Sequence, residues 1–282
     1  TEPLSNPYLM TFLAMTKKHG SFFGIHTNGS LMASLEETQS WLTELCRIAT
    51  SLDDYLTVSL DAGRVESHQK TKNLNKNYFD GIIEGLSAAV KIRGERKAPA
   101  LRVTYLLNQF NSSREEISEL VNLMREIKVD SLRFSIPYDL YGKDFAKVRI
   151  YKKQVEIEQN KKYRKLLEPF LSKSTRDRPF VFYIPPEYQD VDKMNFEQCI
   201  YCYYQITLGA DGYVYRCSST ATPTFKIARL GKITCDIEKF KEMILANEDP
   251  NFKPAVCFRS GARCNRMALE INEQWQKKWK KN

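Results

Sequence analysis

A chain of 282 residues, 42% of them hydrophobic and 27% charged, has enough apolar side chains for a folded core, so an intrinsically disordered protein is excluded. No apolar run approaches the ~18 residues of a membrane-spanning helix, and no targeting signal is visible, so we expect a cytoplasmic protein without a membrane partner. Much of the net charge of +9 lies in residues 143–178 and 276–282. Neither segment interleaves its charges with aromatic residues on strands, so we interpret them as solvated helix faces and do not expect a nucleic-acid partner.

Over the first half of the chain, short β-branched or aromatic runs alternate with amphipathic helical stretches. This alternation predicts an α/β fold with parallel strands and right-handed crossovers, and both a doubly wound sheet and a (β/α) barrel fit it. The predicted strands are 22–27, 55–61, 101–108 and 131–138, and the predicted helices are 7–19, 35–49, 78–92 and 114–127. Two helices open with capping boxes, Ser34 with Glu37 and Ser113 with Glu116, in which each side chain satisfies an amide at the helix start.

The alternation ends after Tyr141. Residues 144–172 predict a long charged helix, and residues 178–186 a last extended segment. Runs at 203–208 and 213–217 flank a turn that contains Gly209 and Gly212, which predicts a hairpin, and helices are expected at 237–247 and 267–280. We therefore divide the chain into a first domain at 1–141, a linking segment at 142–185 and a small α+β domain at 186–282.

Polar residues lie at the carboxyl ends of the predicted strands, which is where parallel β/α folds bind ligands. Asn28 follows the first strand, and Ser59 and Asp61 end the second, two residues apart and so on the same side of the strand. The Asp61 carboxylate is suited to a ribose diol, and the Arg133 guanidinium on the fourth strand to a ligand carboxylate. Turn formation alone is the competing interpretation for Asn28 and Asp61.

The seven cysteines are unevenly placed. Cys46 stands alone on an amphipathic helix and is expected to be a buried small hydrophobe. The other six fall at or after residue 199, and such clustering in a cytosolic chain favours metal over disulfides. Cys235 is interpreted as structural, and by spacing alone an iron–sulfur cluster and a four-thiolate zinc site fit the others equally well. The five candidate ligands are Cys199, Cys202, Cys217, Cys257 and Cys264.

The order of Thr1-Glu2-Pro3, Thr27-Asn28-Gly29 and Ser59-Leu60-Asp61 resembles the radical S-adenosylmethionine (SAM) superfamily from its second barrel strand onward. The resemblance implies a partial (β/α) TIM-like barrel lacking its first strands, followed by a small α+β cysteine-rich domain. It also implies a SAM site. Thr1 and Glu2 would hold the methionine amino group, Asn28 would line the site, Ser59 and Asp61 would contact the ribose, and Arg133 would take the SAM carboxylate.

The reaction implied is reductive cleavage of SAM to a 5′-deoxyadenosyl radical that abstracts a substrate hydrogen. The family's C-x3-C-x2-C signature is absent from this sequence. The chain is therefore expected to be an N-terminally truncated piece that does not cleave SAM by itself. No catalytic residue is assigned.

The late cysteines resemble the SPASM or shorter twitch module of the same superfamily. This implies one auxiliary [4Fe-4S] cluster on Cys217, Cys257 and Cys264 with either Cys199 or Cys202. The implied partners are a peptide or small-molecule substrate and an electron donor such as a flavodoxin or ferredoxin. Two alternatives stay open: a nucleotide substrate, as in molybdopterin precursor synthesis from GTP, and a zinc-binding protein that uses its positive charge to bind nucleic acid.

Overall fold

The computed structural model describes residues 2–33, 35–136, 158–184, 206–215 and 229–245. The chain divides into two compact units, one made of residues 1–137 and 157–186, the other of residues 138–156 and 187–282. The domain boundaries expected at 141/142 and 185/186 lie outside the described residues, so they stay predictions.

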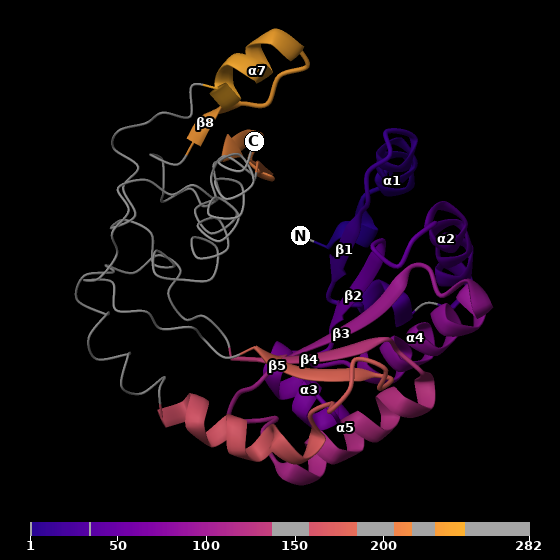
Figure 1. Cartoon of the computed structure of the whole chain (residues 1–282), viewed down its shortest axis with the longest axis vertical. Coiled ribbons are helices and arrows are strands. Elements are labelled where there is room, and N and C mark those ends of the chain that lie inside the picture. Colours follow the sequence, from indigo (N-terminus) through magenta and orange to yellow (C-terminus); the bar gives the residue numbers. More distant parts are fainter. Residues whose placement is uncertain (1, 34, 137–157, 185–205, 216–228, 246–282) are drawn as a thin grey trace, which may run out of the picture. The chain divides into compact units, whose positions relative to one another are not determined.

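The first unit contains a five-stranded parallel sheet (Figure 1). Its strands lie side by side in the same order as in the sequence. A doubly wound sheet requires a reversal of strand order, so the described order favours the singly wound arrangement found in β/α barrels. The predicted α/β fold with parallel strands is thus confirmed, while closure into a barrel stays a prediction. The strands are β1 (Gly24–Thr27), β2 (Tyr55–Ser59), β3 (Ala100–Leu106), β4 (Ser131–Ser135) and β5 (Phe180–Ile184).

Helices connect these strands, and Figure 1 shows α2, α4 and α5 on one side of the sheet. The four helices predicted in this region are confirmed, with ends shifted by two residues at most, whereas α3 was not predicted. Short 3₁₀ turns occur at Pro3–Ser5, Ser30–Ala33, Gly94–Arg96 and Glu168–Phe170. The helices are α1 (Leu9–Lys18), α2 (Leu35–Ile48), α3 (Val65–Lys72), α4 (Phe79–Arg93), α5 (Arg114–Ile127) and residues 158–167.

One face of the sheet packs in a single apolar core with the helices. The amphipathic stripe predicted for α5 lies in this core: Ile117, Leu120, Val121 and Met124 are fully buried. Each such side chain contributes roughly 1.5–3 kcal/mol on burial. Cys46 of α2 is also buried, as predicted. The buried strand residues of this core are Ile25, Leu56, Val58, Leu101, Val103, Tyr105, Leu132, Phe134 and Val181.

Over β1–β4 the opposite face of the sheet carries mostly polar side chains, because successive side chains on a strand alternate between faces. Strand β5 instead brings Phe180 and Phe182 to this face, with Phe182 paired with Arg133. In the register of the sheet, Thr57 is paired with both His26 and Arg102, and Thr104 with both Ser59 and Arg133. The five strands contain no aspartate or glutamate, so the charges that the strands bring to this face are cationic. We call this surface the polar face. It comprises His26, Tyr55, Thr57, Ser59, Arg102, Thr104 and Arg133.

The second unit contains a three-stranded antiparallel sheet of β6 (Thr207–Leu208), β7 (Tyr213–Tyr215) and β8 (Arg229–Lys232), followed by α7 (Ile237–Leu245). The Gly209 amide donates to the Tyr213 carbonyl at 2.7 Å, and Gly212 has a φ of +79°, so the predicted hairpin is confirmed. Strand β8 was not predicted. Residues 144–157 and 267–280, where further helix was expected, lie outside the described residues.

Among the helices of the described residues, none is both long and apolar enough to cross a membrane.

Candidate functional site

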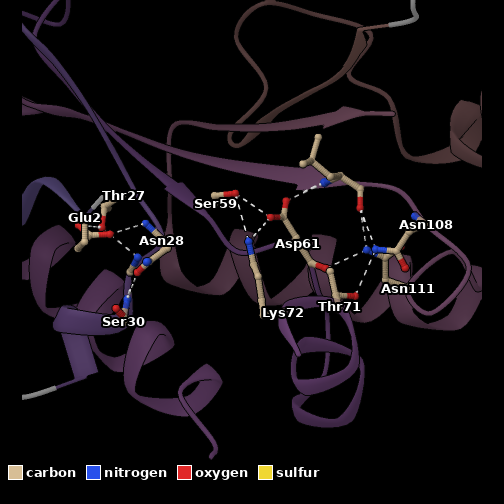
Figure 2. A network of polar contacts seen from close by, with 12 residues as sticks. Glu2, Thr27, Asn28, Ser30, Ser59, Asp61, Thr71, Lys72, Asn108 and Asn111 are labelled. Atoms are coloured by element: carbon tan, nitrogen blue, oxygen red, sulfur yellow. Dashed lines mark hydrogen bonds and ion pairs between the residues drawn. The ribbon is translucent and has the colours of Figure 1, made fainter. Parts of the chain in front are cut away.

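The first part of the candidate site is the Glu2 carboxylate, held where β1 ends (Figure 2). Its Oε1 accepts hydrogen bonds from the Thr27 hydroxyl at 2.6 Å and from the Leu4 amide at 3.1 Å, and its Oε2 accepts one from the Asn28 amide at 2.9 Å. Glu2 is half-buried, and within the described residues no lysine or arginine forms an ion pair with it. The site therefore contains a carboxylate held in place by three hydrogen bonds. Because a carboxylate offers about four acceptor positions, it can still accept a hydrogen bond from a ligand.

Asn28 builds the turn that follows β1. Its side-chain oxygen accepts from the Ser30 amide at 2.8 Å, and the Thr27 hydroxyl accepts from the Gly29 amide at 2.9 Å. Gly29 has a φ of +77°, a conformation that favours glycine. Asn28 is exposed and lies beside Glu2, so one residue shapes the turn and lines the site.

The second part of the site surrounds Asp61, just beyond β2. The Ser59 hydroxyl donates to Asp61 Oδ2 at 2.7 Å, the Lys72 ammonium forms an ion pair with the same oxygen, and the Leu106 amide donates to Oδ1 at 2.8 Å (Figure 2). Ser59 and Asp61 thus meet on one side of the strand. Asp61 is 2% exposed, whereas the Lys72 side chain is 25% exposed. A ligand would therefore meet Ser59 and Lys72, with Asp61 orienting both from behind.

Sequence reasoning missed Lys72 altogether. The residue lies on α3, whose sequence VESHQKTK carries no apolar stripe to predict a helix. The only available signal was the left-handed Asn73 that ends the helix, since asparagine favours such caps.

A buried asparagine after β3 fixes the loop beside Asp61. Asn111 is fully buried, and its amide nitrogen donates to the Asp61 and Leu106 carbonyls, both at 2.8 Å. Its side-chain oxygen accepts from the Asn108 amide at 2.7 Å. Every polar atom of the Asn111 side chain is satisfied, which holds the ends of β2 and β3 together.

The capping box predicted at α5 is half correct. The Ser113 hydroxyl accepts from the Glu116 amide at 3.2 Å, as expected. The Glu116 carboxylate does not return to the helix start; it accepts from the Gly63 amide at 2.8 Å, from the Ser67 hydroxyl and from Tyr105 at 3.2 Å. Burial and then the Glu116 charge raise the pKa of Tyr105, so its phenol stays a neutral donor. A buried polar partner far away in sequence therefore replaces the local cap. Ser34 lies outside the described residues.

Arg133 is in the same cross-strand row as Ser59, two strands away. At the usual strand spacing this separates their backbones by about 10 Å. The structure thus brings Glu2, Asn28, Ser59 and Asp61 to one edge of the sheet, with Arg133 farther along the polar face.

Thr1 and the five candidate metal ligands lie outside the described residues; these ligands are Cys199, Cys202, Cys217, Cys257 and Cys264. Within the described residues, no cluster of metal-ligating side chains occurs. Cys235 is described and exposed.

Comparisons with known proteins show a likeness of fold to a solved structure. No family model and no curated protein matches the sequence. Among solved structures, the chain is similar to the crystal structure of Streptococcus suis SuiB bound to S-adenosylmethionine, with 16% identity and a TM-score of 0.54 over 89% of this chain. The likeness shows a shared fold. The match covers 53% of the SuiB chain, so this chain spans about half the length of that neighbour.

Proposed function

We propose that this chain carries the SAM-binding part of a radical SAM enzyme. The observation that carries the proposal is the placement of a fixed Glu2 carboxylate and of the Ser59–Asp61–Lys72 cluster at the ends of two neighbouring parallel strands. The fold shared with SuiB, whose structure contains SAM, supports it.

The chemistry of these residues fits the groups that SAM presents. Its ammonium matches the Glu2 carboxylate, which has acceptor capacity left. Its ribose diol matches the Ser59 hydroxyl as acceptor and the Lys72 ammonium as donor, while Asp61 fixes both. Its carboxylate matches the Arg133 guanidinium, a bidentate donor.

In the family that the sequence resembles, an iron–sulfur cluster supplies the electron that cleaves SAM. This sequence contains no C-x3-C-x2-C triplet to bind that cluster. The function proposed for this chain's own residues is therefore to bind the cofactor and to fix its ammonium and ribose at the strand ends.

The proposal extends to the cysteine-rich part of the chain. One auxiliary cluster is assigned to Cys217, Cys257 and Cys264 with Cys199 or Cys202. The proposed substrate is a peptide or small molecule, and the proposed electron donor a flavodoxin or ferredoxin.

Isothermal titration calorimetry of the purified chain with SAM tests the cofactor proposal. Glu2→Gln removes the charge that would hold the ammonium, and Ser59→Ala removes the hydroxyl that would meet the ribose. Because a hydrogen bond to a charged group contributes about 1.5–3 kcal/mol, Glu2→Gln should weaken SAM binding about 10- to 100-fold. Ser59→Ala should weaken it by a smaller factor.

The matched control is Glu44→Gln, since Glu44 is a partly exposed carboxylate on α2 that forms an ion pair with Arg47. It should leave SAM affinity unchanged. Absence of SAM binding by the unaltered chain, or equal affinities in Glu2→Gln, Ser59→Ala and the control, would contradict the proposal.

A further inference from the structure

A second cluster lies on the polar face, one row closer to the amino-terminal ends of the strands than Ser59. The Arg102 guanidinium of β3 stacks over the Tyr55 ring of β2, 4.0 Å from its centroid. The His26 ring of β1 meets the same Tyr55 ring edge-on, with 5.6 Å between centroids. Three neighbouring strands thus each contribute one side chain to the cluster.

The backbone beneath the cluster is shaped to accept it. Gly24 is paired with Tyr55 in the sheet, and a Cβ at Gly24 would overlap the Tyr55 ring. The absence of a side chain lets Tyr55 lie across β1, where it meets His26 and receives Arg102. His26 is exposed, and Tyr55 and Arg102 are half-buried, so the cluster is open to a ligand.

Stacking holds the Arg102 guanidinium in place without using its hydrogen-bond donors, which lie in the guanidinium plane and point away from the ring face. The five strands contribute no carboxylate that would neutralise it. Partial desolvation of its ring, then the charges of Arg133 and Arg102, lower the pKa of His26, which leaves a neutral imidazole able to donate one hydrogen bond. An orientated cation next to a neutral donor is suited to an anion.

We propose that Arg102, Tyr55 and His26 form a subsite for an anionic group, a carboxylate or a phosphate, of the substrate. Arg102 is in the row of Thr57, two residues before Ser59 on β2, so the subsite begins roughly 7 Å from the row of the SAM site. The assignment to the substrate rests on the proposed function. The anion site itself is a property of these three side chains.

Histidine NMR provides a direct test, because the chain has only three histidines. The ring signals are followed over pH with inorganic phosphate, with acetate, and with sodium chloride at equal ionic strength. An anion beside Arg102 should raise the pKa of His26 and leave His19, which is exposed, and His68, which is buried, unchanged. Comparison of phosphate with acetate shows which anion the subsite prefers. His26→Gln assigns the signal.

Arg102→Gln should weaken phosphate or acetate binding at least 10-fold and raise the pKa of His26 without any anion, because a neighbouring positive charge is lost. Arg102→Lys keeps the charge but loses the planar stack, so it should bind with intermediate affinity. Arg47→Gln, which changes an exposed arginine of α2, should behave as the unaltered chain. Circular dichroism melting of each variant shows whether it is folded. If Arg102→Gln is unfolded, the comparison is made with Arg102→Lys instead.

Two results separate this proposal from the SAM proposal. Arg102→Gln should keep the SAM affinity of the unaltered chain. The anion subsite is overturned, even where SAM binds, if phosphate and acetate leave the pKa of His26 unchanged. It is also overturned if Arg102→Gln binds these anions with the affinity of the unaltered chain. If the anion binds at Arg102 and SAM does not bind, the subsite stands as an anion site and its assignment to a radical SAM substrate is overturned.

Discussion

Asp61 is the residue on which the second part of the candidate site depends. It has a φ of +56°, and its buried carboxylate ties the Ser59 hydroxyl, the Lys72 ammonium and the Leu106 amide to one point. Burial and the Lys72 charge also lower the pKa of His68, one turn earlier on α3, so that ring stays neutral. Asp61 is thus a positioning residue, and its substitution should act by displacing the groups that it holds, Ser59, Lys72 and Leu106.

Asp61→Asn should destabilise the fold by about 2–3 kcal/mol, because Lys72 keeps a partly buried charge without its counter-ion. Asparagine tolerates the left-handed backbone, so the change isolates the charge, whereas Asp61→Ala adds backbone strain. Urea unfolding monitored by circular dichroism measures the loss. In the double variant Asp61→Asn with Lys72→Met, part of the lost stability should return.

The exposed ion pair between Arg64 and Glu119 supplies the control for Asp61. Glu119→Gln should change stability little, because solvent screens such pairs. Equal effects of Glu119→Gln and Asp61→Asn would show that Asp61 does not anchor the cluster.

At the scale of elements, the polar residues at the two ends of the strands have different roles. At the amino-terminal ends, Asp54 accepts from the Phe23 amide at 3.2 Å and pairs with Lys17 of α1 at 2.9 Å. Asp130 accepts from the Leu101 amide at 2.7 Å and pairs with Arg93 of α4. These carboxylates join strand starts to helices, while the carboxyl ends carry the groups that we propose bind SAM. This is the division between stability and function typical of β/α folds.

Asp54 makes this stability depend on pH. Burial alone would raise the pKa of its carboxyl, but Lys17 and the amides of Thr50, Phe23 and Ser51 outweigh burial and hold the pKa below its ordinary value. A depressed carboxyl pKa contributes stability above the unfolded pKa of about 3.9, and this contribution is lost as pH falls through the folded value.

Asp54→Asn should therefore cost about 2–4 kcal/mol at pH 7, because the partly buried Lys17 loses its charge partner. The difference between the variant and the unaltered chain should shrink as the pH is lowered from 5 to 3. Urea unfolding at a series of pH values measures it. A difference that stays constant from pH 7 to pH 3 would contradict the assignment.

These elements also show what the sequence could reveal. Helix α5 was predicted at its observed ends because five apolar residues repeat on one stripe, and β2 because its run is β-branched and apolar. Helix α3 was not predicted from the sequence because it packs through polar contacts, such as the hydrogen bond from the Ser67 hydroxyl to the Glu116 carboxylate. Ser59 and Asp61 were found from their spacing, whereas Lys72 required knowledge of how α3 folds back. Local patterns predict elements; polar contacts distant in sequence do not leave such a pattern.

Across the whole molecule, the charges of the polar face are a local feature that the net charge of +9 does not reveal. The helix-facing side of the sheet is apolar, and the polar face carries arginines without strand carboxylates. These arginines are a local feature of the sheet, separate from the excess of positive charge in residues 143–178 and 276–282. Such a face is suited to the anionic substrate group that we propose.

The cysteine-rich part of the chain leads to a prediction for the whole protein. Anaerobic reconstitution with iron and sulfide should give a brown protein with about four irons per chain, as a thiolate-held [4Fe-4S] cluster requires. Cys217→Ser should lose most of the iron, because it removes one of four ligands. Cys235→Ser removes a thiol that is exposed and outside the proposed ligand set, so it should keep the full complement of iron. Elemental analysis with absorption spectra measures both. A colourless protein with one zinc would show a zinc site in place of the auxiliary cluster. Equal iron content in both variants would show that Cys217 is not a ligand of the cluster.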